Sequence, residues 1–123
     1  MSKVTHFHIP VDDMKRAKKF YRDVFGWDVE DTGSAFQIMK TAPVDETGKS
    51  TEPGATYGAL FKRQKPDEAP SLVIEVPSID ECIKRVKESG GKLVTPKGSV
   101  GLFGLLAEVR DTEGNLLGIF QNT

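Results

Sequence analysis

The stretch Phe7-His8-Ile9-Pro10-Val11 is matched 65 residues later by Leu72-Val73-Ile74-Glu75-Val76. The same offset relates Gly26 to Gly91. Few of the related residues are identical; what recurs is a strand pattern, then a helix pattern, then a glycine. Because this offset exceeds the usual periods of solenoid repeats, it indicates two half-modules rather than an array.

Each half begins with a strand and a helix. An alternating stretch at about 4–10 predicts a strand, and an apolar stripe at about 13–25 predicts a helix that Gly26 ends as a left-handed cap. In the second half, Ser78 and Glu81 form a capping box that starts a helix at about 79–89.

Three strand-like stretches follow each helix. They lie at about 27–31, 35–40 and 56–63, and at about 92–95, 103–110 and 116–121. We therefore predict an α+β fold in which two tandem βαβββ half-modules form a cleft-shaped mixed sheet. The prediction is one domain over residues 1–123, with half-modules at about 4–63 and 70–122. The glycine-containing stretch 98–104 is expected to be a loop that acts as a lid over the cleft.

Composition excludes several classes of protein. The chain has 123 residues, 17 basic and 18 acidic, and a net charge of −1, so we expect neither a nucleic-acid partner nor a membrane partner. The start of the sequence has no apolar core of the signal-peptide kind. Its single cysteine, Cys82, excludes an internal disulfide framework and a zinc site with several cysteines. We expect a cytoplasmic protein.

Three segments carry a resemblance to a known family. They are His6-Phe7-His8-Ile9-Pro10-Val11-Asp12-Asp13-Met14, Phe20-Tyr21-Arg22-Asp23-Val24-Phe25-Gly26-Trp27 and Asp111-Thr112-Glu113-Gly114-Asn115-Leu116-Leu117-Gly118. Together they resemble the glyoxalase/bleomycin resistance protein/dioxygenase superfamily, also called the vicinal oxygen chelate superfamily. The chain is most similar to its small glyoxalase-like subgroup, related to lactoylglutathione lyase.

The resemblance implies four metal-ligand positions, on the first and last strand of each half. They correspond here to His6, Gly58, Ser71 and Gly118. Glycine offers no ligand and serine is a poor one, so only His6 is retained. We therefore predict no cofactor and no tightly bound divalent metal; the alternative is a divalent metal that binds weakly at His6.

His6 and His8 leave the same side of their strand, opposite Phe7 and Ile9. By the resemblance, that side faces the ligand cleft. The alternative is that the two histidines only form local hydrogen bonds. Tyr57 is expected on the helix side of the sheet, as part of the core.

The second half contains a hairpin around Gly114. A three-residue loop pairs Glu108 with Gly118, which directs Glu108 and Arg110 into the cleft. We predict that Glu108 works as a general acid/base across the cleft from His6. The alternative is that Glu108 and Arg110 are an inert surface pair.

These inferences lead to one functional hypothesis and two alternatives. We expect a homodimer that binds a small molecule and acts as a glyoxalase-like lyase or isomerase. Its catalytic residues would be His6 and Glu108, and its ligand-binding residues His8, Ser71, Glu75 and Arg110. The first alternative is a non-catalytic protein that sequesters a ligand, as bleomycin-resistance proteins do. The second is a structural or regulatory dimer.

Overall fold

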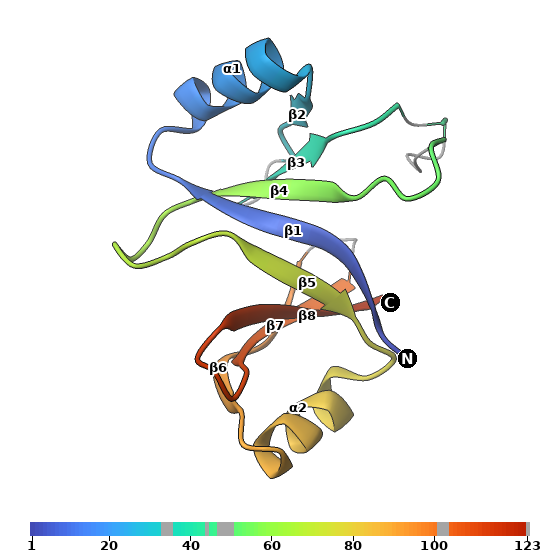
Figure 1. Ribbon diagram of the computed structural model, residues 1–123, viewed down its shortest axis with the longest axis vertical. Coiled ribbons are helices and arrows are strands. Elements are labelled where there is room, and N and C mark those ends of the chain that lie inside the picture. The colour runs from blue at the N-terminus through green and yellow to red at the C-terminus, as the bar shows by residue number, and fades with distance from the viewer. Residues whose placement is uncertain (33–35, 44, 47–50, 101–103, 123) are drawn as a thin grey trace. The chain divides into compact units, whose positions relative to one another are not determined.

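The computed structural model describes residues 1–32, 36–43, 45–46, 51–100 and 104–122 (Figure 1). The chain groups into two compact units: an N-terminal unit, His6–Pro70, and a C-terminal unit, Ser71–Thr123 together with Met1–Thr5. The described elements, in chain order, are β1 (Lys3–Val11), α1 (Met14–Phe25), β2 (Asp28–Glu30), β3 (Phe36–Lys40), β4 (Tyr57–Lys62), β5 (Ser71–Glu75), α2 (Ile79–Glu88), β6 (Lys92–Ser99), β7 (Gly104–Arg110) and β8 (Leu116–Asn122).

The N-terminal unit has its strands in the order β2-β3-β4-β1. The β1–β4 pair is parallel and the other two pairs are antiparallel. The Asp13 carboxylate accepts a hydrogen bond from the Arg16 amide at 3.0 Å and so caps α1. Gly26 ends this helix at φ 73°, as predicted. The helix packs over a core of Val11, Met39 and Leu60.

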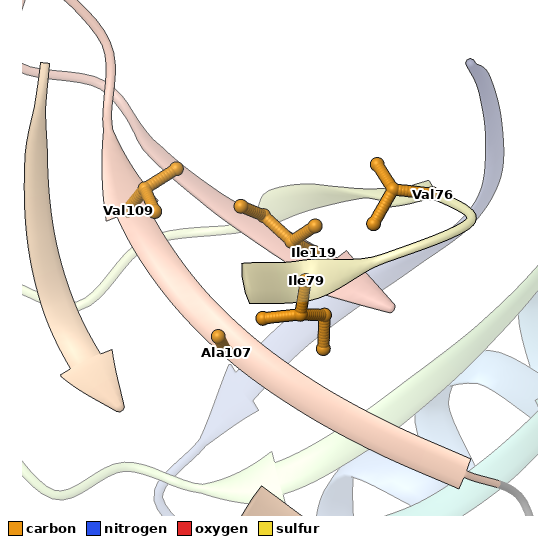
Figure 2. Packing of buried hydrophobic residues seen from close by; sticks show 5 residues of the cluster. All are labelled: Val76, Ile79, Ala107, Val109 and Ile119. Atoms are coloured by element: carbon orange, nitrogen blue, oxygen red, sulfur yellow. The ribbon is translucent and has the colours of Figure 1, made fainter. Parts of the chain in front are cut away.

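The C-terminal unit repeats this plan with its strands in the order β5-β8-β7-β6. The Ser78 hydroxyl accepts from the Glu81 amide at 3.3 Å, which confirms the predicted cap of α2. The core of this unit contains Val76, Ile79, Ala107, Val109 and Ile119, which Figure 2 shows in close-up. Ile79 is fully buried, and burying such a side chain contributes about 1.5–3 kcal/mol.

The predicted α+β fold class is confirmed, and each unit has the βαβββ order. One boundary was wrong: β6 extends to Ser99, with irregular pairing to β7 after Leu93, so Gly98 and Ser99 are strand residues rather than loop residues. Residues 101–103 of the expected lid lie outside the described residues. Neither described helix combines the length and the apolar character that crossing a membrane requires.

Candidate functional site

One face of the N-terminal unit carries both histidines. Phe7 and Ile9 of β1 pack with α1 on the core side, so the alternating residues His6 and His8 leave the opposite side. Pairing with β4 places His6 beside Tyr57 and His8 beside Ala59. We call this surface the histidine face; it comprises His6, His8, Phe36, Ile38, Tyr57, Ala59 and Phe61.

The His8 ring lies between two aromatic rings. Its centroid is 6.4 Å from that of Phe36, with planes 28° apart, and 5.8 Å from that of Phe61, in an edge-on contact. The His6 ring centroid is 6.2 Å away. Burial, with a smaller contribution from the charge of His6, lowers the pKa of His8 to about 4. At neutral pH His8 is therefore uncharged and offers one nitrogen donor and one nitrogen acceptor.

Tyr57 is on the histidine face, and the expectation that it belongs to the helix side was wrong. Leu60, three residues further along β4, enters the core under α1, so Tyr57 points to the opposite side of the strand. The Tyr57 hydroxyl is buried, and among the described residues it has no hydrogen-bond partner. Sequence reasoning missed this residue because β4 is apolar on both faces.

A charged pair lies close to Tyr57. Lys40 Nζ is 2.7 Å from Glu30 Oε2. The hydrogen bond to Glu30 raises the pKa of Lys40, and the charges of Glu30 and Asp28 and the electrostatic interaction with Tyr57 act in the same direction. The cation beside Tyr57 is thus balanced by carboxylates of β2.

The expected ligand position Gly58 is also corrected. Gly58 pairs with Phe7, and a Cβ atom at Gly58 would lie 2.3 Å from Phe7 Cε2, so position 58 faces the core. Gly118, the corresponding position in the C-terminal unit, pairs with Val73. The 65-residue offset relates Val73 to His8, whose partner on β4 is Ala59. Position 59 is therefore the equivalent of position 118, and alanine likewise offers no ligand.

The hairpin of β7 and β8 has the predicted register. Glu108 pairs with Gly118 and Arg110 with Leu116, as expected. The Glu108 carboxylate accepts a hydrogen bond from Thr95 Oγ1 at 2.8 Å. Arg110 Nη1 donates to the carbonyl of Gly114 at 2.7 Å, so its guanidinium holds the hairpin.

The space beside Gly118 has apolar walls. A Cβ atom at this position would lie 3.1 Å from Val73 Cγ2 and 3.6 Å from Leu106 Cδ1. Val73 itself is fully buried. The nearest side chains at Gly118 are thus hydrocarbon. The Glu108 carboxylate instead accepts the hydrogen bond from Thr95.

Ser71 and Glu75 lie on the same sheet face as Glu108, because they alternate with the residues of β5 that pack towards α2. Glu75 lines a cavity of about 510 Å³ with Met1, Ser2, Lys3, Val76, Pro77 and Asn122. Its carboxylate accepts from Asn122 Nδ2 at 2.8 Å. The structure thus gathers His6 and His8 in the N-terminal unit and Ser71, Glu75, Glu108 and Arg110 on one face of the C-terminal unit.

The residues at the family's metal positions do not fit a metal ion. Only His6 offers a ligand, because Ala59 and Gly118 have none and Ser71 has a neutral hydroxyl. In the described ranges, no group of three or more His, Cys, Asp or Glu side chains is arranged to hold a metal.

Comparisons with known proteins agree with this architecture. A family model described as "Glyoxalase/Bleomycin resistance protein/Dioxygenase superfamily" matches residues 3–119. A "Glyoxylase-like domain-containing protein" of Didymella fabae is 29% identical over 117 residues, which cover 91% of this chain and 88% of the relative.

Solved structures show the same fold at low sequence identity. A superfamily member from Vibrio splendidus 12B01 superimposes with a TM-score of 0.63 at 19% identity, covering 99% of this chain and 100% of that one. A variant of Streptomyces coelicolor methylmalonyl-CoA epimerase, in complex with 2-nitronate-propionyl-CoA, gives a TM-score of 0.67 at 16% identity, covering 98% and 97%. At these identities the likeness concerns the fold alone.

Proposed function

The chain belongs to the glyoxalase/bleomycin resistance protein/dioxygenase superfamily, and on that premise we propose that it is a lyase or isomerase that binds a small organic ligand on the histidine face. The observation that carries this proposal is the grouping of His6 with an uncharged His8 and with Tyr57, whose hydroxyl has no partner within the described part of the chain. One sheet face thereby combines a group for proton transfer with neutral hydrogen-bonding groups that hold a ligand.

The proposed chemistry is proton transfer. His6 accepts a proton from a carbon next to a carbonyl group of the ligand, and the proton returns at the same or the neighbouring carbon. All atoms are retained, so the net reaction is an isomerisation; loss of a leaving group from the neighbouring carbon makes it a lyase reaction. Glu108, on the C-terminal unit, is a second acid/base candidate. His8, Ser71, Glu75 and Arg110 are candidates for ligand contacts.

A second candidate function is sequestration of a ligand without turnover, as in the bleomycin-resistance branch. The observation that favours it is the packing of Phe36 and Phe61 against a neutral His8. These three rings form an apolar surface on which a flat ligand can stack. Binding of that kind needs no catalytic step.

Thermal unfolding with three probes separates the two functions. The probes are S-lactoylglutathione, 2-nitronate-propionyl-CoA and bleomycin. Ligand at about 100 times its Kd stabilises the folded state by about 2.7 kcal/mol and raises the Tm by several degrees. We expect one of the acyl-thiol conjugates to raise the Tm of the wild type, and His6→Asn to lose the catalysed exchange of solvent deuterium into that conjugate. Stabilisation by bleomycin alone favours sequestration, and no response to any probe contradicts both functions.

We also propose a cytoplasmic homodimer. Light scattering at roughly tens of micromolar protein, where a functional dimer is populated by mass action, tests the oligomeric state. A molecular mass of twice the 13.5 kDa of one chain is expected, and a monomer contradicts the proposal.

A further inference from the structure

Three apolar side chains of α1 are exposed to solvent. Phe20, Val24 and Phe25 are 54–55% exposed, and none of them is among the side chains that form the core under the helix. The rings of Phe20 and Phe25 lie against each other, with their centroids 6.4 Å apart. We call these three side chains the α1 patch. Exposed apolar side chains that lie together are typical of an interaction surface.

The duplication of the chain shows that the fold does not require this patch. At the positions related by the 65-residue offset, the C-terminal unit has Arg85, Ser89 and Gly90, all of them exposed. The second helix therefore packs on its sheet with polar residues or glycine where α1 has apolar side chains. The α1 patch is thus not needed to fold a half-module, as expected of side chains that bind a partner.

The charges of α1 indicate the kind of partner. The helix has five basic residues and one acidic residue, Asp23, which pairs with Lys19 and Arg22. In the second helix, three basic residues are balanced by three acidic ones. No ion pair within the described residues engages the other three basic residues of α1, which are Lys15, Arg16 and Lys18. A partner complementary to α1 is therefore anionic.

The acidic residues just before α1 leave this excess in place. Asp12 pairs with Arg63, which lies outside the helix. The Asp13 carboxylate caps the first turn. With Asp13 included, basic residues still outnumber acidic ones by five to two. The net charge of −1 of the whole chain conceals this local excess.

Among anionic partners, the composition of α1 favours a lipid surface. A second copy of α1 is disfavoured, because two helices with the same excess of positive charge repel each other. Three of the five basic residues are lysines, which are depleted in protein–protein interfaces. Arg16 lies one turn before Phe20, and Arg22 one turn before Phe25, so cations and apolar groups are neighbours on the helix surface. Basic residues beside exposed phenylalanines are typical of helices that lie on an anionic membrane surface.

We propose that α1 docks on a bilayer that contains anionic lipids, with the α1 patch in the interfacial layer and the basic side chains against the headgroups. The inference goes beyond the proposed function and does not depend on it. The net charge of the whole chain predicted no membrane partner, but a surface contact depends on the local charge of α1. Such a contact requires no membrane-spanning helix.

Co-sedimentation of the whole chain with vesicles tests the proposal. The vesicles consist of phosphatidylcholine alone or of an equimolar mixture of phosphatidylcholine and phosphatidylglycerol. Arg16→Glu alters the charge of α1, and its control Lys84→Glu makes the same change of charge on the second helix. Phe20→Ser alters the α1 patch, and its control Leu72→Ser removes an apolar side chain that is 49% exposed in the C-terminal unit. Glutamate is suited to position 16, since Glu81 occupies the equivalent position in the capping box of the second helix.

We expect the wild type to bind only the vesicles that contain phosphatidylglycerol, and to bind them less at high salt. Arg16→Glu and Phe20→Ser should each weaken binding about fivefold or more, while both controls stay within about twofold of the wild type. The proposal is overturned if the wild type binds neither kind of vesicle or binds both equally, or if the controls weaken binding as much as the α1 variants. It is also overturned if the wild type ignores vesicles and Phe20→Ser dissociates a dimer, because the patch is then an interface between copies of the chain.

Discussion

His6 and Tyr57 occupy paired positions on the parallel strands β1 and β4, so their side chains leave the same face of the N-terminal unit. This pairing brings an imidazole and a phenol together on the face opposite α1. The N-terminal unit thus carries a proton acceptor and a hydrogen-bond donor within one surface. Ala59, which pairs with His8, has no side chain that could bind a metal on this face.

The stability of the protein should depend on pH through His8. Its pKa is about 4 in the folded protein and about 6.5 when unfolded, so the unfolded state binds more protons between these values. The free energy of unfolding therefore falls as the pH is lowered from about 6.5 to about 4, by at most roughly 3 kcal/mol from this residue. Urea unfolding of the wild type and of His8→Gln at several pH values isolates the contribution, because the other groups titrate in both proteins. A constant difference between the two proteins across this range would contradict the burial of a neutral His8.

The orientation of β4 can be tested at Gly58. An alanine Cβ there would meet the Phe7 ring at 2.3–2.9 Å, so the ring has to move within the core. We expect Gly58→Ala to lower the free energy of unfolding by about 1–3 kcal/mol. Gly98→Ala is the control, since its Cβ has no neighbour within 4 Å and its stability should be unchanged or up to about 1 kcal/mol higher. Equal stability of both variants would mean that position 58 does not face the core.

Glu108→Gln separates an acid/base role from a structural one. The amide oxygen of glutamine still accepts the hydrogen bond from Thr95 Oγ1, so the free energy of unfolding should change by less than about 0.5 kcal/mol. If Glu108 is a general acid/base, the variant should lower the turnover of whichever acyl-thiol conjugate the wild type converts by about 10²–10⁴-fold. Unchanged turnover and binding would contradict the acid/base role. The hydrogen bond with Thr95 would then be the only role left for Glu108.

The metal content of the purified protein should be low. Ala59, Ser71 and Gly118 stand at family ligand positions without a suitable donor, so His6 alone cannot hold zinc, nickel or iron tightly. Elemental analysis after purification without chelators should find well below one divalent ion per chain. A stoichiometric metal that His6→Asn removes would overturn this prediction.

The hairpin was predictable from the sequence, while the position of Tyr57 was not. In β7 and β8 the residues Ala107, Val109, Leu117 and Ile119 are apolar, and next to the turn Glu108, Arg110 and Gly118 alternate with them. The register that pairs Glu108 with Gly118 therefore buries the apolar set on one face. Gly114 at φ 84° then fixes the turn.

In β4, by contrast, residues 57–61 are apolar or small on both faces. Alternation cannot orient such a strand, and its face is set only by pairing with β1 and β3. The aromatic surroundings of His8 come from two strands that are distant from it in sequence, with Phe36 on β3 and Phe61 on β4. A local sequence pattern does not predict contacts between distant strands. The lowered pKa of His8 therefore could not be predicted from the sequence either.

Nuclear magnetic resonance of the imidazole groups shows whether a ligand binds at the histidine face, because His6 and His8 are the only histidines in the chain. Long-range ¹H–¹⁵N spectra of the free protein should show His8 as a neutral ring at pH 6, consistent with a pKa of about 4. During titration with S-lactoylglutathione or 2-nitronate-propionyl-CoA, we expect the signals of both rings to shift and saturate with the same Kd as calorimetry gives. A conjugate that binds by calorimetry while both imidazole signals stay in place would contradict the claim that the histidine face is the ligand site.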